Sequence, residues 1–273
     1  MWKSSNPVLT HSDDAFREAY GHMDATGANQ TTLGGVVNRT FLLVLLTVCA
    51  GAGGYALLGV IGASAIWIGS ISAFITVLAV GFLLTRKAHL APYLAPVYAI
   101  VEGVFLGALT ALADQILASR GLTVAGGVGL QAFIVTMSAV ISMLVLYKLG
   151  VRPTRMFMAV IGVATAAIML AYLVSFIMMI VLGQPLPLIS FASAVADKGV
   201  MGFLGLGINI FILIVASLWL IIDFKMVEDA VEAGEPKYME WYLGFALLVT
   251  LAWIYYEAVK LVVRLAVLFG GRD

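Results

Sequence analysis

Charged residues are scarce in this 273-residue chain: they make up 11% of it, whereas a soluble domain carries about a quarter. Apolar residues make up 62%, well above the share of nearly one half that is typical of soluble domains. The 15 Lys and Arg residues balance the 15 Asp and Glu residues, so no basic field is available to attract nucleic acid. The composition therefore predicts a membrane protein in contact with a lipid bilayer, and it excludes a soluble globular fold and nucleic-acid binding.

Cysteine and histidine are also rare. The single cysteine, Cys49, rules out an intramolecular disulfide and a thiolate metal cluster. The three histidines, His11, His22 and His89, lie outside the long apolar runs. The sequence has no His-Glu-x-x-His motif, no Gly-x-x-x-x-Gly-Lys-Ser/Thr loop and no Gly-x-Gly-Asp turn. A metalloprotease, an ATP-driven pump and an intramembrane protease are therefore unsupported, and we expect no enzymatic activity and no cofactor.

Long apolar runs separated by short polar stretches dominate what is present. A membrane-spanning helix needs roughly 20 predominantly apolar residues, and seven runs of that kind follow a polar leader that covers residues 1–35. We expect the leader to be disordered and cytoplasmic, and residues 36–273 to form one all-α transmembrane domain of seven helices. The expected spans are 41–61, 65–84, 92–113, 130–147, 156–182, 200–222 and 242–267.

The distribution of Lys and Arg gives the expected orientation, because cytoplasmic loops keep the positive charge. Most of the basic residues fall on the amino-terminal side of a seven-span arrangement, including Arg86, Lys87 and Arg152. The amino terminus should therefore be cytoplasmic and the carboxyl terminus outside. Lys260, Arg264 and Arg272 argue mildly against the second half of that statement.

Small residues recur in three of the expected spans. Gly51 lies in the first span, Gly103 and Gly107 in the third, and Gly202 and Gly205 in the sixth. Helices in lipid associate through small residues that let their backbones approach closely. These glycines are expected to serve helix packing.

Three acidic residues stand inside or at the end of apolar runs, where charge is costly and usually marks an ion or proton pathway. Glu102 lies near the middle of the third span, with no basic residue in the same helix. Glu257 lies in the seventh span, where Lys260 three residues later is an alternative, purely structural partner. Asp223 lies where the sixth apolar run ends, so it is either a functional group or the polar end of the span.

Polar residues at seven-residue spacing predict one inward face on each of the last two spans. In the seventh span these are Thr250, Glu257 and Arg264, with Lys260 on the same face. In the sixth span the face carries Asn209 and Asp223, together with Gly202 and Ala216.

The order of several short motifs resembles the Bax-inhibitor-like family, also called the transmembrane Bax inhibitor motif family, and in particular its bacterial branch. The resemblance covers most of the chain. The motifs are Ser5-Asn6-Pro7, Glu102-Gly103 with Leu106-Gly107, Asp223-Phe224, Glu240-Trp241-Tyr242 and the aromatic-rich segment from Thr250 to Glu257.

The resemblance implies six helices around a central seventh, in a pH-sensitive channel that leaks calcium across the bacterial inner membrane. In the family, two hydrogen-bonded acids on the sixth and seventh helices open or close the path as they bind protons. Asp223 matches the first acid, and its partner is either Glu257 or Glu102. Two carboxyls that share a site bind protons in coupled steps, and their oxygens suit transient calcium binding, which places a weak metal site at Asp223 and Glu257.

Two other functions stay open. The protein is alternatively a non-conducting regulator that binds a membrane protease or another channel. A retinal protein is the second alternative, because Lys260 on the last span and Glu102 on the third suit a Schiff base and its counter-ion. The positive-inside pattern disfavours it.

Overall fold

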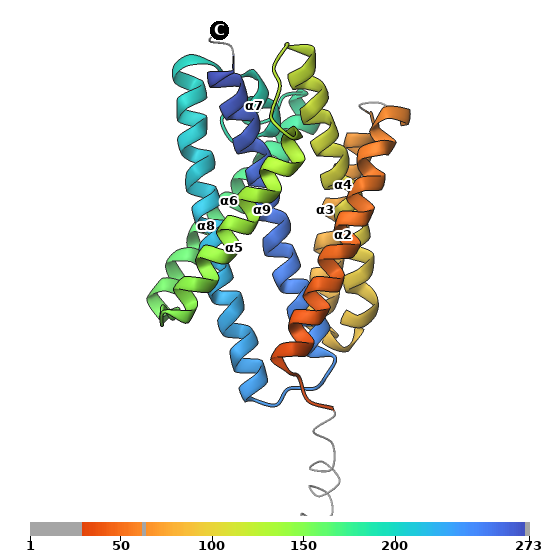
Figure 1. The fold of residues 1–273 in the computed structure, drawn as a ribbon, viewed down its shortest axis with the longest axis vertical. Coiled ribbons are helices and arrows are strands. Elements are labelled where there is room, and N and C mark those ends of the chain that lie inside the picture. The colour runs from red at the N-terminus through yellow and green to blue at the C-terminus, as the bar shows by residue number, and fades with distance from the viewer. Residues whose placement is uncertain (1–28, 62–63, 271–273) are drawn as a thin grey trace, which may run out of the picture.

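The computed structural model describes residues 29–61 and 64–270, so most of the leader, with its Ser5-Asn6-Pro7 motif, and Arg272 lie outside the described part. Seven helices in this part are long and apolar enough to cross a membrane (Figure 1). They are α2 (Leu33–Ile61), α3 (Ser64–Arg86), α4 (Ala91–Ser119), α5 (Gly127–Lys148), α6 (Arg155–Leu182), α8 (Gly199–Glu232) and α9 (Met239–Phe269). Two short elements join them: the 3-10 helix η2 (Ala88–Leu90) and the helix α7 (Phe191–Ala196).

The seven long helices alternate in direction, so the start of α2 and the end of α9 lie at opposite ends of the bundle (Figure 1). The basic connections at Arg86-Lys87 and at Arg152 both lie at the end where α2 begins. The predicted all-α membrane fold with seven spans is confirmed.

Helix α9 runs through the middle of the bundle, in contact with α2, α4, α5 and α8 (Figure 1). In its most apolar stretch 61% of the residues are buried inside the protein, whereas the share is 11% in α6 and 17% in each of α2, α3 and α5. The other two helices are more peripheral: α3 packs against α4, and α6 packs against α8. The seventh span is therefore central, as expected: four long helices pack closely along it, and α6 reaches it through the side chain of Tyr172.

Two helices are longer than the apolar runs that predicted them. Helix α2 begins at Leu33, so residues 33–35 are helical although we assigned them to the leader. The hydroxyl of Thr32 accepts a hydrogen bond from the backbone N–H of Gly35 at 3.0 Å and caps the helix there. Helix α8 continues ten residues past Ile222, because Lys225 pairs with Glu228 and Asp229 along the same face of its polar end.

The glycines of α2 and α4 bring the two backbones into contact. A Cβ atom on Gly54 would overlap the carbonyl of Val104, and one on Gly107 would overlap the carbonyl of Gly51. The packing role predicted for Gly51 and Gly107 is confirmed. Gly205 of α8 serves another purpose, because a Cβ atom there would overlap the guanidinium group of Arg264.

Candidate functional site

The polar side chains of α9 point into the protein. Thr250, Glu257, Lys260 and Arg264 are 4%, 0%, 1% and 2% exposed. On α8, Asn209 and Asp223 are buried as well. The two inward faces predicted from the seven-residue spacing are confirmed, and together they form a polar interior between α8 and α9.

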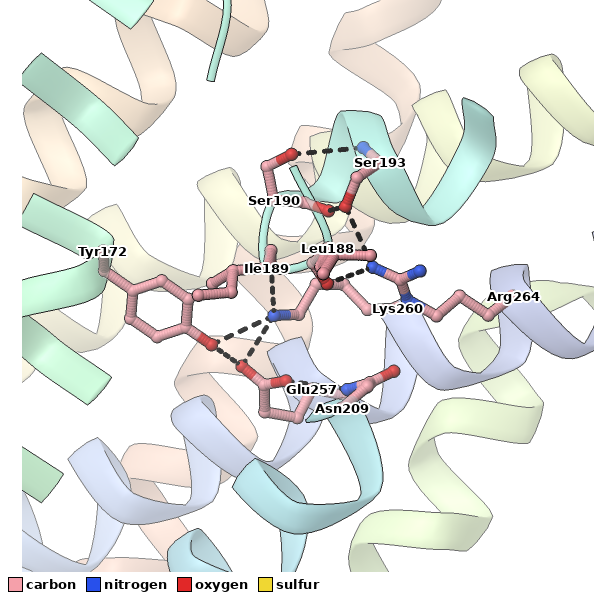
Figure 2. Close-up of polar contacts among 9 residues, drawn as sticks. All are labelled: Tyr172, Leu188, Ile189, Ser190, Ser193, Asn209, Glu257, Lys260 and Arg264. Atoms are coloured by element: carbon pink, nitrogen blue, oxygen red, sulfur yellow. Dashed lines mark hydrogen bonds and ion pairs between the residues drawn. The ribbon is translucent and has the colours of Figure 1, made fainter. Parts of the chain in front are cut away.

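Glu257 is the centre of one polar group (Figure 2). Its Oε1 atom accepts a hydrogen bond from the hydroxyl of Tyr172 on α6, and the Nζ atom of Lys260 lies 2.9 Å from the same oxygen. Its Oε2 atom accepts a hydrogen bond of 2.7 Å from the Nδ2 atom of Asn209. Every oxygen of this carboxyl group therefore has a partner, and Lys260 neutralises its charge. We refer to Tyr172, Asn209, Glu257 and Lys260 as the Glu257 group.

The connection between α6 and α8 folds back onto the carboxyl-terminal half of α9 (Figure 2). The Nζ atom of Lys260 donates to the backbone oxygen of Ile189 at 3.0 Å. The Nη2 atom of Arg264 donates to the backbone oxygen of Leu188 at 2.5 Å and to the hydroxyl of Ser193 at 2.9 Å. Leu188 adopts a positive φ of 70°, a conformation that costs a non-glycine residue energy and needs support from its surroundings. The two cations of α9 provide that support and hold the connection in place.

Asp223 has a simpler environment. The hydroxyl of Thr250 on α9 donates a hydrogen bond of 2.7 Å to its Oδ2 atom, and the Asp223 side chain is 3% exposed. Among the described residues, no Lys, Arg or His forms an ion pair with Asp223. It is therefore a buried carboxyl whose charge, when present, has no neutralising partner.

Asp223 and Glu257 do not form the hydrogen-bonded pair that the resemblance implied. Asp223 is bonded to Thr250, whereas Glu257 is bonded two helical turns further along α9, roughly 10 Å away at 1.5 Å per residue. Helix α8 stays helical to Glu232, so the connection between α8 and α9 does not bring the two acids together. Two acids this far apart cannot ligate one calcium ion, and the described residues contain no cluster of three or more acidic, Cys or His side chains suited to a metal.

Glu102 is not a partner of Asp223 either. It lies on α4, one turn after Tyr98, and has no hydrogen bond or ion pair with another described residue. The ring of Tyr98 packs edge-on against Phe245 of α9 at 5.1 Å, which places Glu102 near the depth of Thr250, since α4 and α9 run in the same direction. The carboxylate beside Lys260 is that of Glu257, so the geometry gives no support to Glu102 as a counter-ion for a retinal Schiff base.

Several members of these polar groups were not predicted from the sequence. One of them is Tyr172, whose hydroxyl donates to Glu257 from the apolar stretch of α6. A tyrosine inside an apolar run was the sequence feature that could have predicted this contact. The backbone oxygens of Leu188 and Ile189 left no signal, because a carbonyl group is present at every residue. Glu240 was matched as part of a motif only, yet it is buried and accepts hydrogen bonds from Thr32.

A bundle of seven apolar helices with a polar interior along its central helix defines an integral membrane protein that crosses the bilayer several times. The chain matches the family described as Bax inhibitor 1 like over residues 6–267, which is nearly its whole length. It belongs to that family. No curated protein sequence and no solved structure shows a significant match to the chain.

Proposed function

We propose that the protein is a pH-sensitive calcium leak channel of the Bax inhibitor 1 like family, that it lies in the bacterial inner membrane with a cytoplasmic amino terminus, and that it has no enzymatic activity. The observation that carries the proposal is the carboxyl group of Asp223, which is buried against the central helix with Thr250 as its hydrogen-bond partner and, among the described residues, no cation paired with it. Intramembrane acids of this kind mark ion and proton pathways.

Protonation of Asp223 would change the contact between α8 and α9. An ionised carboxylate only accepts hydrogen bonds, whereas a protonated carboxyl group also donates one. The bond from Thr250 and the charge between the two helices therefore both depend on this proton. Glu257 is less suited to be the switch, because Lys260 neutralises it and three side chains hold it. Glu102 is the second candidate, since it also has no neutralising partner among residues 29–61 and 64–270.

Calcium would meet these acids one at a time. Oxygen ligands suit this ion, and conduction requires binding that is weak enough to release it. A series of single carboxyl groups at different depths fits transient contact better than a closed cage of ligands does.

Calcium flux into liposomes that contain only the purified protein tests the proposal. Wild-type flux should change between mildly acidic and mildly alkaline pH, and Asp223→Asn should remove that dependence. Glu232→Gln is the matched control, because Glu232 lies on the same helix but is exposed. Glu102→Gln and Glu257→Gln, alone and combined with Asp223→Asn, identify any acid that acts together with Asp223, since residues that act as a unit give non-additive effects. Wild-type pH dependence in all three single variants would show that the acids are structural.

The non-conducting regulator remains the second candidate, favoured by one observation. The carboxyl-terminal half of α9 is covered by the α6–α8 connection, and Lys260 and Arg264 donate hydrogen bonds to backbone oxygens of that connection. A protein that only binds a membrane protease or another channel needs no open path. Absence of calcium flux at every pH in liposomes would favour this candidate over the channel.

A further inference from the structure

A groove with a volume of about 600 Å³ lies between α2 and α5, with α4 and α9 as its floor. This volume is within the range of roughly 300–1,000 Å³ that is usual for small-ligand pockets. Three residues of its walls, Val48, Leu130 and Phe133, are 54%, 52% and 44% exposed, so the groove is open to the surface of the bundle.

The groove is as long as one leaflet of a bilayer. On α4 it extends from Gly103 to Asp114, and on α2 from Val44 to Tyr55, which is roughly 16 Å along each helix at 1.5 Å per residue. Half of the hydrocarbon core of a bilayer is about 15 Å thick. The groove begins near the middle of the bundle and ends where α4 approaches its carboxyl end, so it lies in the leaflet on the side of the carboxyl terminus.

Most of the lining is apolar. The hydroxyl groups of Thr47 and Thr136, toward the inner end, are bonded to backbone oxygens of their own helices. The hydroxyl groups of Thr110 and Tyr255 lie part of the way along the floor and are bonded to each other at 3.0 Å. Among the described residues of the lining, Asp114 is the one that carries a charge, and it lies next to Tyr55 at the end of the groove nearer the carboxyl terminus. An apolar cavity does not hold ordered water well, so this lining fits a hydrocarbon chain better than an aqueous path.

The carboxyl group of Asp114 retains capacity for a ligand. Its Oδ2 atom accepts from the hydroxyl of Tyr55 at 3.1 Å, and its Oδ1 atom accepts from the backbone N–H of Val128 at 2.9 Å. A carboxylate has about four lone-pair positions, so roughly two stay available. Because no basic residue in the described part of the chain lines the groove, a positively charged head group is favoured there and an anionic one is not.

We propose that this groove binds one membrane lipid of the leaflet on the carboxyl-terminal side, with an acyl chain between α2 and α5 and a primary ammonium head group against Asp114. The groove is about as long as one leaflet, which favours an acyl chain as its ligand. The carboxylate of Asp114 favours a positively charged head group. The inference is independent of ion conduction, since it concerns a different set of residues from the polar interior of α8 and α9.

Lipid retention measured by native mass spectrometry tests the proposal. The full chain is placed in nanodiscs that contain equal amounts of phosphatidylethanolamine and phosphatidylglycerol, and the lipid that remains bound on release is identified. Wild type should retain one phosphatidylethanolamine. Ala52→Phe, which fills the groove from the α2 wall, should lose it, whereas Ala167→Phe on the exposed surface of α6 should retain it. Leu130→Trp fills the groove from the opposite wall and serves as an independent block if Ala52→Phe fails to fold.

The head-group preference is tested separately. Asp114→Asn should retain the two lipids equally, because the amide has no charge with which to select an ammonium group. Asp229→Asn is its control and should keep the wild-type preference. The proposal is overturned if wild type retains no lipid or shows no preference for phosphatidylethanolamine. Equal retention by wild type and both groove-filling variants would also overturn it, and so would a second copy of the chain seated in the groove in place of lipid.

Discussion

The Nζ atom of Lys260 lies 2.9 Å from the Oε1 atom of Glu257, and these two side chains are only 1% and 0% exposed. The pair lies within one turn of α9, so the central helix carries its own neutralising charge into the bundle. The remaining Lys260 contacts, to Tyr172 and to the backbone oxygen of Ile189, link that charge to α6 and to the α6–α8 connection.

Removing one member of this pair should destabilise the protein strongly. Lys260→Met leaves Glu257 buried without a cation, and Glu257→Gln leaves Lys260 without an anion; losing one partner of a buried pair costs about 3–5 kcal/mol. The double variant should lose less than the sum of the two single losses, because no unpaired charge remains. Thermal unfolding in detergent measures all three, and strictly additive losses would show that the two side chains are not coupled.

The guanidinium group of Arg264 needs the space that Gly205 leaves. In Gly205→Ala the new methyl group overlaps this guanidinium, and overpacking of this kind costs about 1–3 kcal/mol. The control is Gly207→Ala on the same helix, where a Cβ atom meets nothing within 4 Å. The melting temperature should fall in the first variant and stay close to wild type in the second. Equal melting temperatures would contradict the tight fit between α8 and Arg264.

The hydroxyl of Thr250 should matter for pH sensing. Thr250→Val keeps the shape of the side chain but removes the donor to Asp223, so the pH profile of calcium flux should change. Thr250→Ser keeps the donor and should keep the profile. The measurement is the liposome flux assay across the same pH range. An unchanged profile in Thr250→Val would show that the hydrogen bond from Thr250 to Asp223 does not contribute to pH sensing.

The arrangement of the helices makes the position of the two termini testable. Seven spans place them on opposite sides of the membrane, and the basic connections favour a cytoplasmic amino terminus. A reporter fused after Asp273 should therefore be active on the outside, whereas a reporter inserted at the loop containing Arg152 should be active in the cytoplasm. Finding both reporters on the same side would rule out the topology.

The sequence was sufficient for the broad fold because apolar runs record which segments must lie in lipid. The seven-residue spacing of Thr250, Glu257 and Arg264 likewise recorded which face of the last helix is buried. Depth was harder to predict. Hydropathy ends α8 near Ile222, but the pairing of Lys225 with Asp229 extends the helix, and this extension keeps Asp223 away from Glu257.

Contacts through the backbone could not be predicted at all. The α6–α8 connection is held to Lys260 and Arg264 by carbonyl groups, which carry no residue-specific signal. The hydrogen bond between Asp223 and Thr250 also depends on the axial register of α8 against α9. The spacing of side chains within one helix does not determine that register.

Asp223 and Glu257 lie at different depths, each nearer a different side of the bundle. Asp223 lies roughly 14 Å from the end of α8 at Glu232 but roughly 36 Å from its other end at Gly199. Glu257 lies nearer the opposite face, roughly 18 Å from the end of α9 at Phe269. The distance along α8 is therefore much shorter from the compartment in which α2 begins, and we expect protons to reach Asp223 from that side. A switch at Asp223 would thus respond to the pH of that single compartment. Acidification on the opposite side would have little effect on its protonation.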